Sequence, residues 1–543
     1  MANPGGNLDF DVAIVGYGPV GQALAALLGR AGQRVGAFER FQEIYRLPRA
    51  VHLDHEIMRL LQTLGLAEVL AEEMIPVHDY QWFGADGELL MRFETHGPAP
   101  SGWETDYMFF QPELERAIDR HACGLSTVTV ERGWEATGLV DRGEGIELTL
   151  RRVEEEEEEE AGRLALTGDT RTVRARWLVG ADGANSFVRE AAGITRRDLG
   201  FQERWLVVDA EPHDMGALAH LPIASQWCDP KRPTTVVQSG PRHRRWEFML
   251  LADEQSSDFE DPDRVWSLLE PWYGPEDGPL TRSMVYEFRS MLADEMRKGH
   301  VLLVGDAAHL TPPFLGQGLC SGLRDAANLA WKLDLVLRGL AGERLLDSID
   351  PERQPQNEAV IVLAVELGKV LCQLDPQAAA ERDATLRQAE PPPPPELAPL
   401  TGGVIHRPAG GDADPLAGKL SVQGTVSRAG GEGRFDDVVG PGFQLIVADG
   451  DPLEQLSREH RALIDTLDTT VASLDADAPH GVRDVDGRLT AWLSEHGTYA
   501  VLVRPDFYVF GSASSAEQLP LLLEDLGSQL HVSSTPATAG AIP

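Results

Sequence analysis

A glycine-rich segment near the start of the chain has the spacing that binds a dinucleotide pyrophosphate. Gly16, Gly18 and Gly21 follow an apolar, β-branched run at 11–15, and Pro19 lies within the loop. The first glycine permits a tight turn, the second lets the backbone approach the phosphates, and the third lets the next helix pack against the strand. The start of that helix directs unpaired N–H groups and a partial positive charge at the phosphates.

An acidic residue stands at the position that binds the ribose of a dinucleotide. Residues 34–38 are predicted to form the second strand, and Glu39 ends it 18 residues after Gly21. A carboxylate here can accept hydrogen bonds from both ribose hydroxyls, and it repels a 2′-phosphate. The loop and Glu39 therefore predict a tightly bound dinucleotide other than NADP, and they leave NAD and FAD open.

A second segment, far along the chain, can hold the other end of a dinucleotide. Gly305 and Asp306 follow a buried-strand pattern at 301–304, so the Asp306 carboxylate is expected at the carboxyl end of a strand. A carboxylate there can bind a ribityl hydroxyl, a group that FAD has and NAD lacks. Two holding segments therefore favour FAD over a freely exchanging NAD.

A helix is predicted to start just after this segment. Pro312 breaks the chain, and Gly316 and Gly318 then precede a run in which Leu319 and later apolar residues recur at helical spacing. A glycine-rich helix N-terminus suits the negative charge that a reduced flavin carries at its N1–C2 carbonyl edge. An ordinary helix start without a ligand is the alternative interpretation.

A third segment, 177–186, is predicted to be a strand that ends in Asp182 and Gly183 and continues into a helix. A plain Asx turn after a strand is the alternative. The three segments, in this order, closely resemble the class A, single-component flavoprotein aromatic hydroxylases over residues 8–365.

The resemblance implies further site residues. Arg49 and Gln111 would also touch FAD, and Asp182 would serve both FAD and NAD(P)H. Arg40, next to Glu39, is counted with the cofactor-binding residues. Within the family, three stretches are similar to the 3-(3-hydroxyphenyl)propionate hydroxylase subgroup, although hydroxylases of polyketide aromatics share much of them. These stretches are 201–209, 227–233 and 245–249.

The fold implied by the resemblance is α/β. A Rossmann-like FAD-binding domain of the glutathione-reductase type would be interleaved with an α+β substrate domain and followed by a thioredoxin-like C-terminal domain. The expected ranges are 1–75, 101–195 and 296–365 for the FAD-binding domain, 76–100 and 196–295 for the substrate sheet, 366–431 for a helical segment and Pro-rich linker, and 432–543 for the C-terminal domain. That last region lacks a CxxC pair, so a structural or homodimer-contact role is expected instead of redox chemistry.

The composition of the chain narrows the functional classes. Its 543 residues are enough for two or three domains, and a formal net charge of −38 argues against nucleic acid or an anionic membrane as partner. No secretory signal or apolar run of about 18 residues is recognised. The four cysteines are scattered without metal-binding spacing. These features predict a cytoplasmic protein without a metal site.

Two low-complexity runs have simple interpretations. Glu154–Glu160 is an uninterrupted acidic run between two predicted strands, and mutual repulsion favours a solvated hairpin loop there. Pro391–Pro395 is typical of a stiff spacer in polyproline conformation or of disorder.

The resemblance also implies a reaction. NADH or NADPH would bind transiently, reduce the flavin and leave, and O2 would then form a flavin C4a-hydroperoxide that is attacked by a phenol ring ortho to its oxygen. A small phenolic acid such as 3-(3-hydroxyphenyl)propionate is the expected substrate, with a polycyclic polyketide phenol as the alternative. A non-catalytic flavin-binding scaffold is a third hypothesis, and the motifs disfavour a simple NAD dehydrogenase or a flavin halogenase.

Such a reaction requires a dry pocket and a way to remove the phenol proton. Candidate pocket residues, with ordinary core packing as the alternative, are Trp227, Phe248, Met249 and Phe314. Candidate catalytic bases are His52 and Asp54, with ordinary hydrogen bonding as the alternative, while His309 either holds the flavin loop or acts on substrate. A propionate group would need a cation, and the available arginines are Arg204, Arg242, Arg244, Arg245 and Arg289.

Overall fold

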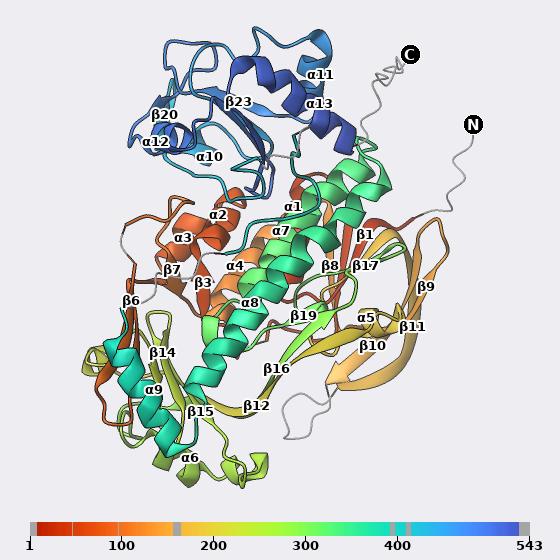
Figure 1. Ribbon diagram of the computed structural model, residues 1–543. Coiled ribbons are helices and arrows are strands. Elements are labelled where there is room, and N and C mark those ends of the chain that lie inside the picture. Colours follow the sequence, from red (N-terminus) through yellow and green to blue (C-terminus); the bar gives the residue numbers. More distant parts are fainter. Residues whose placement is uncertain are drawn as a thin grey trace.

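The protein was analysed as a computed structural model that describes residues 8–45, 47–95, 97–155, 164–390, 397–408 and 414–530. The acidic run beyond Glu155 and the Pro391–Pro395 spacer lie outside the described residues. Three parts follow one another in space (Figure 1): a sheet near the N-terminus, a second sheet at one end of the molecule, and a C-terminal unit at the opposite end, with helix α8 (Ile349–Leu371) running between the two ends.

The first sheet is the predicted doubly wound layer. Its main path runs β17 (Arg297–Lys298), β18 (Val301–Leu303), β11 (Leu164–Gly180), β1 (Phe10–Val15), β2 (Val35–Glu39) and β8 (Val128–Arg132). Strands β18, β11, β1, β2 and β8 are parallel to their neighbours. Because other chain segments cover both faces of such a sheet, β1, β2 and β18 consist mostly of apolar, buried residues. An antiparallel extension is formed by β9 (Trp134–Asp141) and β10 (Ile146–Glu155).

The parallel arrangement brings the three motifs to one edge. Val15 pairs with Gly180, and Gly180 pairs with Leu303, so the loops after β1, β11 and β18 leave the sheet side by side. Ligands of open α/β sheets bind outside the carboxyl ends of the strands. The glycine loop, Asp182 and Asp306 therefore share this edge, although they are far apart in sequence.

Helices α1 (Pro19–Arg30) and α7 (Gly318–Leu337) pack against each other on this layer. A glycine permits the close contact: a Cβ atom added at Gly322 of α7 would lie 2.7 Å from Val20 Cγ2 of α1. Further helices of the N-terminal half are α2 (His55–Thr63), α3 (Ala67–Ala71), α4 (Gln111–Cys123) and α5 (Phe187–Ala191). A small sheet beside them has the order β3 (His52–Asp54), β7 (Asp106–Met108) and β4 (Ile75–Val77).

The second sheet is formed mainly by the ranges predicted for a substrate sheet, and we keep that name for it. Its order is β19 (His309–Leu310), β16 (Leu280–Ala293), β12 (Arg196–Ala210), β15 (His243–Met249), β14 (Thr234–Ser239), β13 (Ala224–Trp227), β5 (Asp79–Phe83) and β6 (Leu89–Glu94). Strand β19 continues directly from the Gly305–Asp306 segment, so the cofactor segment is hydrogen-bonded into the substrate sheet. We call the face that packs with α6 (Pro262–Leu269) and the Phe259–Tyr273 region the outer face, and the face toward the first sheet the inner face.

The C-terminal unit has the thioredoxin-like topology that was expected. Its main sheet runs β23 (Thr470–Ser473), β22 (Gln444–Val447), β25 (Ala500–Val503) and β26 (Val509–Ala513), with β22 and β23 parallel and the other pairs antiparallel. Its helices are α10 (Phe435–Val438), α11 (Arg458–Thr466), α12 (Arg488–Glu495) and α13 (Leu519–Leu530). The antiparallel pair of β25 and β26 and the final helix α13 complete the unit.

The described part of the segment between the units contains a helix and buried apolar residues. Helix α9 (Pro376–Gln388) follows α8, and Leu400 and Ile405 are buried against Tyr508. Strand β20 (Thr425–Arg428) pairs with β21 (Gly431–Arg434) and β24 (Arg483–Asp484). The C-terminal unit thus begins before residue 432, because apolar residues of the preceding stretch complete its core. In the part of the chain that the structure describes, no helix is both long and apolar enough to cross a membrane.

Candidate active site

The glycine loop has the geometry of a phosphate cradle. Gly16 adopts φ +91°, and a Cβ atom there would lie 2.3 Å from the Ala181 oxygen, so no other residue fits. A Cβ atom at Gly18 would meet nothing within 4 Å, which leaves open space beside the backbone. Helix α1 starts after Gly18 without a side-chain cap, so its first N–H groups are available to an anion.

Glu39 is fixed for the ribose role by two backbone donors. Its Oε2 accepts from Tyr17 N at 2.8 Å, and its Oε1 accepts from Phe41 N at 3.0 Å. A hollow of about 320 Å³ borders the following residues and is lined by Gln42, Glu43, Ile44, Arg116, Asp119 and Arg132. Arg40 is exposed and pairs with Glu135 at 3.7 Å.

The Gln111 side chain binds the backbone of the Arg49–Ala50 segment. Its Oε1 accepts hydrogen bonds from Arg49 N at 2.8 Å and Ala50 N at 2.7 Å, and its Nε2 donates to Glu115 at 2.7 Å. The Arg49 guanidinium lies over the Tyr45 ring, 5.0 Å from its centroid. Gln111 therefore sets the path of the Arg49 segment, as the starting residue of helix α4.

Asp182 is engaged at the start of helix α5. Its carboxylate accepts from Ser186 Oγ at 2.5 Å and from Val188 N at 3.0 Å. Burial raises the pKa of this carboxyl. The side chain that the resemblance connects to FAD and NAD(P)H thus also orders the turn after β11.

Asp306 differs from the other acidic residues of the edge. Its side chain is exposed to solvent, yet the surrounding protein desolvates it enough to raise the pKa of its carboxyl. This combination is expected of a carboxylate that faces into a recess. Gly305, just before it, adopts φ +61° and is held through its N–H by Asp325 Oδ2 at 3.0 Å.

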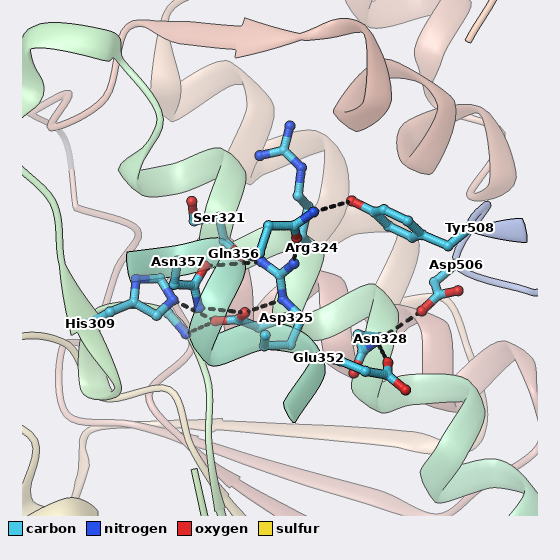
Figure 2. A network of polar contacts seen from close by, with 12 residues as sticks. His309, Ser321, Arg324, Asp325, Asn328, Glu352, Gln356, Asn357, Asp506 and Tyr508 are labelled. Carbon is cyan, nitrogen blue, oxygen red and sulfur yellow. Dashed lines mark hydrogen bonds and ion pairs between the residues drawn. The ribbon is translucent and has the colours of Figure 1, made fainter. Parts of the chain in front are cut away.

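Asp325 on α7 is the organising residue of the Gly305 segment (Figure 2), and sequence reasoning missed it. Besides Gly305 N, its Oδ2 bonds His309 Nε2 at 2.6 Å, while its Oδ1 accepts from Arg353 Nε at 2.8 Å. Burial raises the pKa of Asp325, but His309 and Arg353 outweigh it and lower the pKa to about 2. His309 therefore holds the loop through Asp325, one of its two expected roles.

The same network reaches the C-terminal unit (Figure 2). Arg353 donates to the Gln356 side chain, and Gln356 Nε2 donates to the Tyr508 hydroxyl at 3.1 Å. One helical turn away, Glu352 binds Lys332 at 2.8 Å and Arg504 at 2.7 Å. Residues of two units thus satisfy one buried set of charges behind the cofactor edge.

His52 lies against the start of helix α7. Its Nδ1 is 3.2 Å from the Gly316 oxygen, and its Nε2 is 2.7 Å from Asp106 Oδ1. Both partners are acceptors, so both ring nitrogens must donate, and the ring is an imidazolium. Burial lowers the pKa of His52, but the hydrogen bond to Asp106 contributes to raising it well above the usual value. In this arrangement His52 has no free lone pair with which to take a proton.

Asp54 is occupied by structural contacts. Its Oδ1 caps helix α2 by accepting from Glu56 N at 3.1 Å and Ile57 N at 3.2 Å, and its Oδ2 binds Arg324 of α7. Burial raises the pKa of Asp54, and the Arg324 guanidinium outweighs it and holds the pKa far below the usual range. A carboxylate with so low a pKa is a weak base.

The four expected pocket residues lie on two different faces of the substrate sheet. Met249 and Phe314 belong to one buried cluster with Trp205. Phe248 and Trp227 instead pack on the outer face against Trp272, with ring centroids 6.0 and 5.8 Å away. The structure therefore brings Met249 and Phe314 together toward the cofactor side and leaves Trp227 and Phe248 in a separate core.

The inner face of the sheet also carries charged residues, of which only Arg245 was a candidate from the sequence. Asp209 binds Arg245 Nε at 2.7 Å and Arg282 Nη2 at 2.5 Å, and all three side chains are buried. Arg245 further donates to the backbone oxygens of Pro48 and Arg49. Glu247, two residues on, is also buried on this face. Their alternation along β15 (243, 245, 247, 249) was the available signal.

The arginines proposed for a propionate group are all engaged. Arg245 is bound by Asp209, and Arg244 donates to the Pro222 oxygen from the outer face. Arg204 donates to the Glu254 backbone oxygen at 2.9 Å. The two remaining arginines form exposed ion pairs, Arg242 with Glu73 at 3.3 Å and Arg289 with Glu287.

Comparison with known proteins agrees with this geometry. The family model described as "FAD binding domain" matches residues 9–364, and the one described as "HcaD C-terminal domain" matches residues 418–529. The chain is 39% identical over 526 residues to the "Probable NADH-specific resorcinol 4-hydroxylase" of Rhodococcus jostii (strain RHA1), covering 95% of this chain and 94% of that protein. The chain belongs to the class A FAD-dependent aromatic hydroxylases.

Other relatives place the hydroxylase in the same group. It is 32% identical over 535 residues to the "3-(3-hydroxy-phenyl)propionate/3-hydroxycinnamic acid hydroxylase" of Burkholderia cenocepacia (strain HI2424), covering 93% of this chain and 94% of that protein. Among solved structures, the flavin-dependent monooxygenase PieE superposes with TM-score 0.78 at 22% identity, over 97% of this chain and 100% of that chain. Aklavinone-11 hydroxylase superposes with TM-score 0.73 at 23% identity, over 96% and 99% of the two chains. These two structures share the fold.

The residues of the hydroxylase fit FAD. The edge offers an open phosphate cradle at Gly18, an anchored ribose carboxylate at Glu39, and a recessed carboxylate at Asp306. Helix α7 also starts without a side-chain cap, and His309 Nδ1 is buried without a hydrogen-bond partner among the described residues. The enzyme is an NAD(P)H-dependent flavoprotein monooxygenase that uses FAD and O2.

Proposed function

We propose that this hydroxylase adds one hydroxyl group to a small, uncharged phenol of the resorcinol type, ortho to a phenolic oxygen, with NADH as the reductant. When bound, FAD supplies the chemistry that activates O2. Support for the substrate and the reductant comes from the name of the Rhodococcus jostii relative, which shares 39% of its residues with this chain. Support for the absence of a substrate charge comes from the inner face of the sheet.

The charge balance of the inner face is the main support for an uncharged substrate. A phenolic acid would bring a carboxylate into this space, where it would need a cation. The buried guanidiniums of Arg245 and Arg282 already share Asp209. Glu247 adds a further acidic side chain on the same face. A neutral ring with hydroxyl groups can enter without leaving a buried charge unpaired.

The protein then has three tasks in the reaction. Asp325 and His309 fix the Gly305 segment, which carries Asp306 at the cofactor edge. Met249 and Phe314 contribute apolar surface that excludes water, which keeps the activated oxygen for the substrate. A further group must accept the phenolic proton, because a phenolate directs attack to its ortho carbon.

The proposal predicts substrate selectivity. NADH oxidation should be stimulated by resorcinol with a kcat/KM at least about tenfold higher than with 3-(3-hydroxyphenyl)propionate, since burial of an unpaired carboxylate costs more than the 1.4 kcal/mol that corresponds to a factor of ten. Steady-state kinetics with both phenols, each with product mass analysis, measures the ratio. A preference for the phenolic acid would contradict the proposed substrate class.

A further inference from the structure

We propose that Glu247 is the catalytic base that accepts the proton of the substrate's phenolic hydroxyl. The inference rests on the proposed function, since it needs a phenol on the inner face of the substrate sheet. It adds a catalytic residue that lies in none of the three cofactor motifs.

The position of Glu247 on the inner face of the substrate sheet supports this role. Side chains alternate along β15, so Arg245, Glu247 and Met249 share the inner face. Arg245 donates to the Pro48 and Arg49 backbone oxygens, on one side of the expected flavin site. Met249 belongs to the buried cluster of Phe314, which lies two residues before Gly316 on the other side. Glu247 stands between these two contacts and therefore faces the space between sheet and cofactor edge.

The Glu247 carboxylate is also available to bind a ligand. Glu247 is 7% exposed, and its carboxylate interacts with the Arg245 side chain. Its nearest cation is Arg245 Nη1, 3.6 Å from Glu247 Oε1. The buried carboxylates of Asp54, Asp325 and Glu352 each accept two or more hydrogen bonds. The contact between Glu247 and Arg245 is longer, so the Glu247 carboxylate keeps more oxygen lone pairs for a ligand than these three do.

The electrostatic surroundings of Glu247 suit a base. Burial raises the pKa of Glu247, and Asp209 acts in the same direction, while Arg245 and Arg282 oppose them. Tyr80, whose own pKa burial raises, is a further titratable group near Glu247. A carboxylate with a raised pKa is a stronger base than an ordinary glutamate, as general-base catalysis requires. Arg245 at the same time stabilises the ionised form that must be present before the proton transfer.

The proposed step is a single proton transfer. The phenolic O–H bond breaks, its electron pair stays on the phenol oxygen, and the proton forms an O–H bond to a Glu247 Oε atom. The products are a neutral carboxylic acid and a phenolate, whose charge activates the ortho carbon. No oxidant or reductant is consumed in this step.

The test is the pH profile of Glu247→Gln. With resorcinol, kcat/KM of the wild type should rise with pH through the pKa of Glu247, because only the ionised carboxylate accepts a proton. Glu247→Gln should lose this acidic limb and about 10²- to 10⁴-fold of kcat/KM near neutral pH. Glu247→Asp should keep the limb at lower activity. An unchanged acidic limb in Glu247→Gln would overturn the assignment.

A nitro-substituted phenol that is already ionised at the assay pH separates a base from a structural residue. It needs no proton acceptor, so Glu247→Gln should turn it over within about threefold of the wild-type rate. An equal loss with both phenols would overturn the proposal. Glu203→Gln is the matched control, because Glu203 is a half-buried glutamate on β12 whose pKa burial also raises. The pH profile of Glu203→Gln should match that of the wild type.

Two measurements, bound FAD and turnover of uncharged phenols by the wild type, distinguish a catalytic role of Glu247 from a structural role and from failure of the proposed function. Bound FAD, measured from its visible absorbance, should be the same in Glu247→Gln and wild type, and a loss would instead show a structural role for Glu247. If the wild type hydroxylates no uncharged phenol, the proposed function itself fails. If it does so and Glu247→Gln keeps the wild-type pH profile, only the catalytic role of Glu247 fails.

Discussion

Single residues at the cofactor edge gain their roles from partners that are distant in sequence. His52 is an imidazolium because Asp106 and the Gly316 oxygen both accept from it, and Asp54 is a helix cap bound to Arg324. The sequence could identify these residues as chemically capable, but it could not show what they face. For the glycines the sequence is more informative, because their spacing alone predicts the backbone conformation that they permit.

Glu115 yields a prediction at the residue scale. Burial raises the pKa of Glu115 to about 7, from an ordinary value of 4.5. The unfolded chain therefore ionises first as the pH rises, and the folded protein loses up to about 3 kcal/mol of stability between pH 4.5 and about 7.5. Glu115→Gln cannot ionise, so its stability relative to the wild type should increase over this pH range.

Thermal unfolding of both holoproteins from pH 5 to pH 8 measures this effect. The difference in Tm should shift in favour of the variant as the pH rises. A difference that stays constant with pH would mean that Glu115 is ionised in the folded protein. Glu113→Gln, a partly exposed neighbour on α4, serves as the control.

At the scale of elements, the motifs predicted the layout of the cofactor layer well. The strands at 11–15, 34–38 and 301–304 appear as β1, β2 and β18 with small differences at their ends. The pocket was predicted less well, because Phe248 and Met249 are adjacent and must point to opposite faces of β15. Composition alone favours both as pocket residues, whereas strand alternation permits only one of them.

Asp325→Asn tests the link between helix α7 and the cofactor segment. The change keeps the shape but removes the charge that His309 and Arg353 share, and breaking a buried pair costs about 3–5 kcal/mol. The Gly305 segment should loosen, so the affinity for FAD should fall by at least about tenfold. Fluorescence of released FAD measures the dissociation constant. Asp334→Asn, less buried on the same helix, should bind FAD normally, and equal affinities for FAD in Asp325→Asn and wild type would contradict this role.

At the scale of the whole molecule, the C-terminal unit completes the buried core of the enzyme. Arg59 of α2 is 1% exposed and donates to Asp436 at 2.6 and 2.9 Å, and its guanidinium lies 4.6 Å from the Phe507 ring centroid. Together with Arg504–Glu352 and Gln356–Tyr508, this contact joins the unit to the helices behind the cofactor. No sequence motif marks these pairs, since each residue is ordinary in its local context.

Arg59→Ala should weaken the attachment of the C-terminal unit. It leaves the Asp436 carboxylate buried without its cation, at a cost of about 3–5 kcal/mol. Limited proteolysis with rising temperature should cut between the units earlier than in wild type. Arg338→Ala removes an exposed pair with Asp468 across the same boundary, and should shift the pattern little, since such pairs contribute about 0–1 kcal/mol. Identical patterns for Arg59→Ala and wild type would rule out a stabilising role.

The central claim is that the enzyme transfers one atom of O2 to a small, uncharged phenol. Incubation of the FAD-loaded enzyme with NADH, resorcinol and ¹⁸O-labelled O2, followed by mass spectrometry, tests it most directly. The expected product is a trihydroxybenzene that carries one ¹⁸O atom, with NADH consumed in equal amount. Peroxide as the only product from every uncharged phenol, beside a labelled product from a phenolic acid, would contradict it.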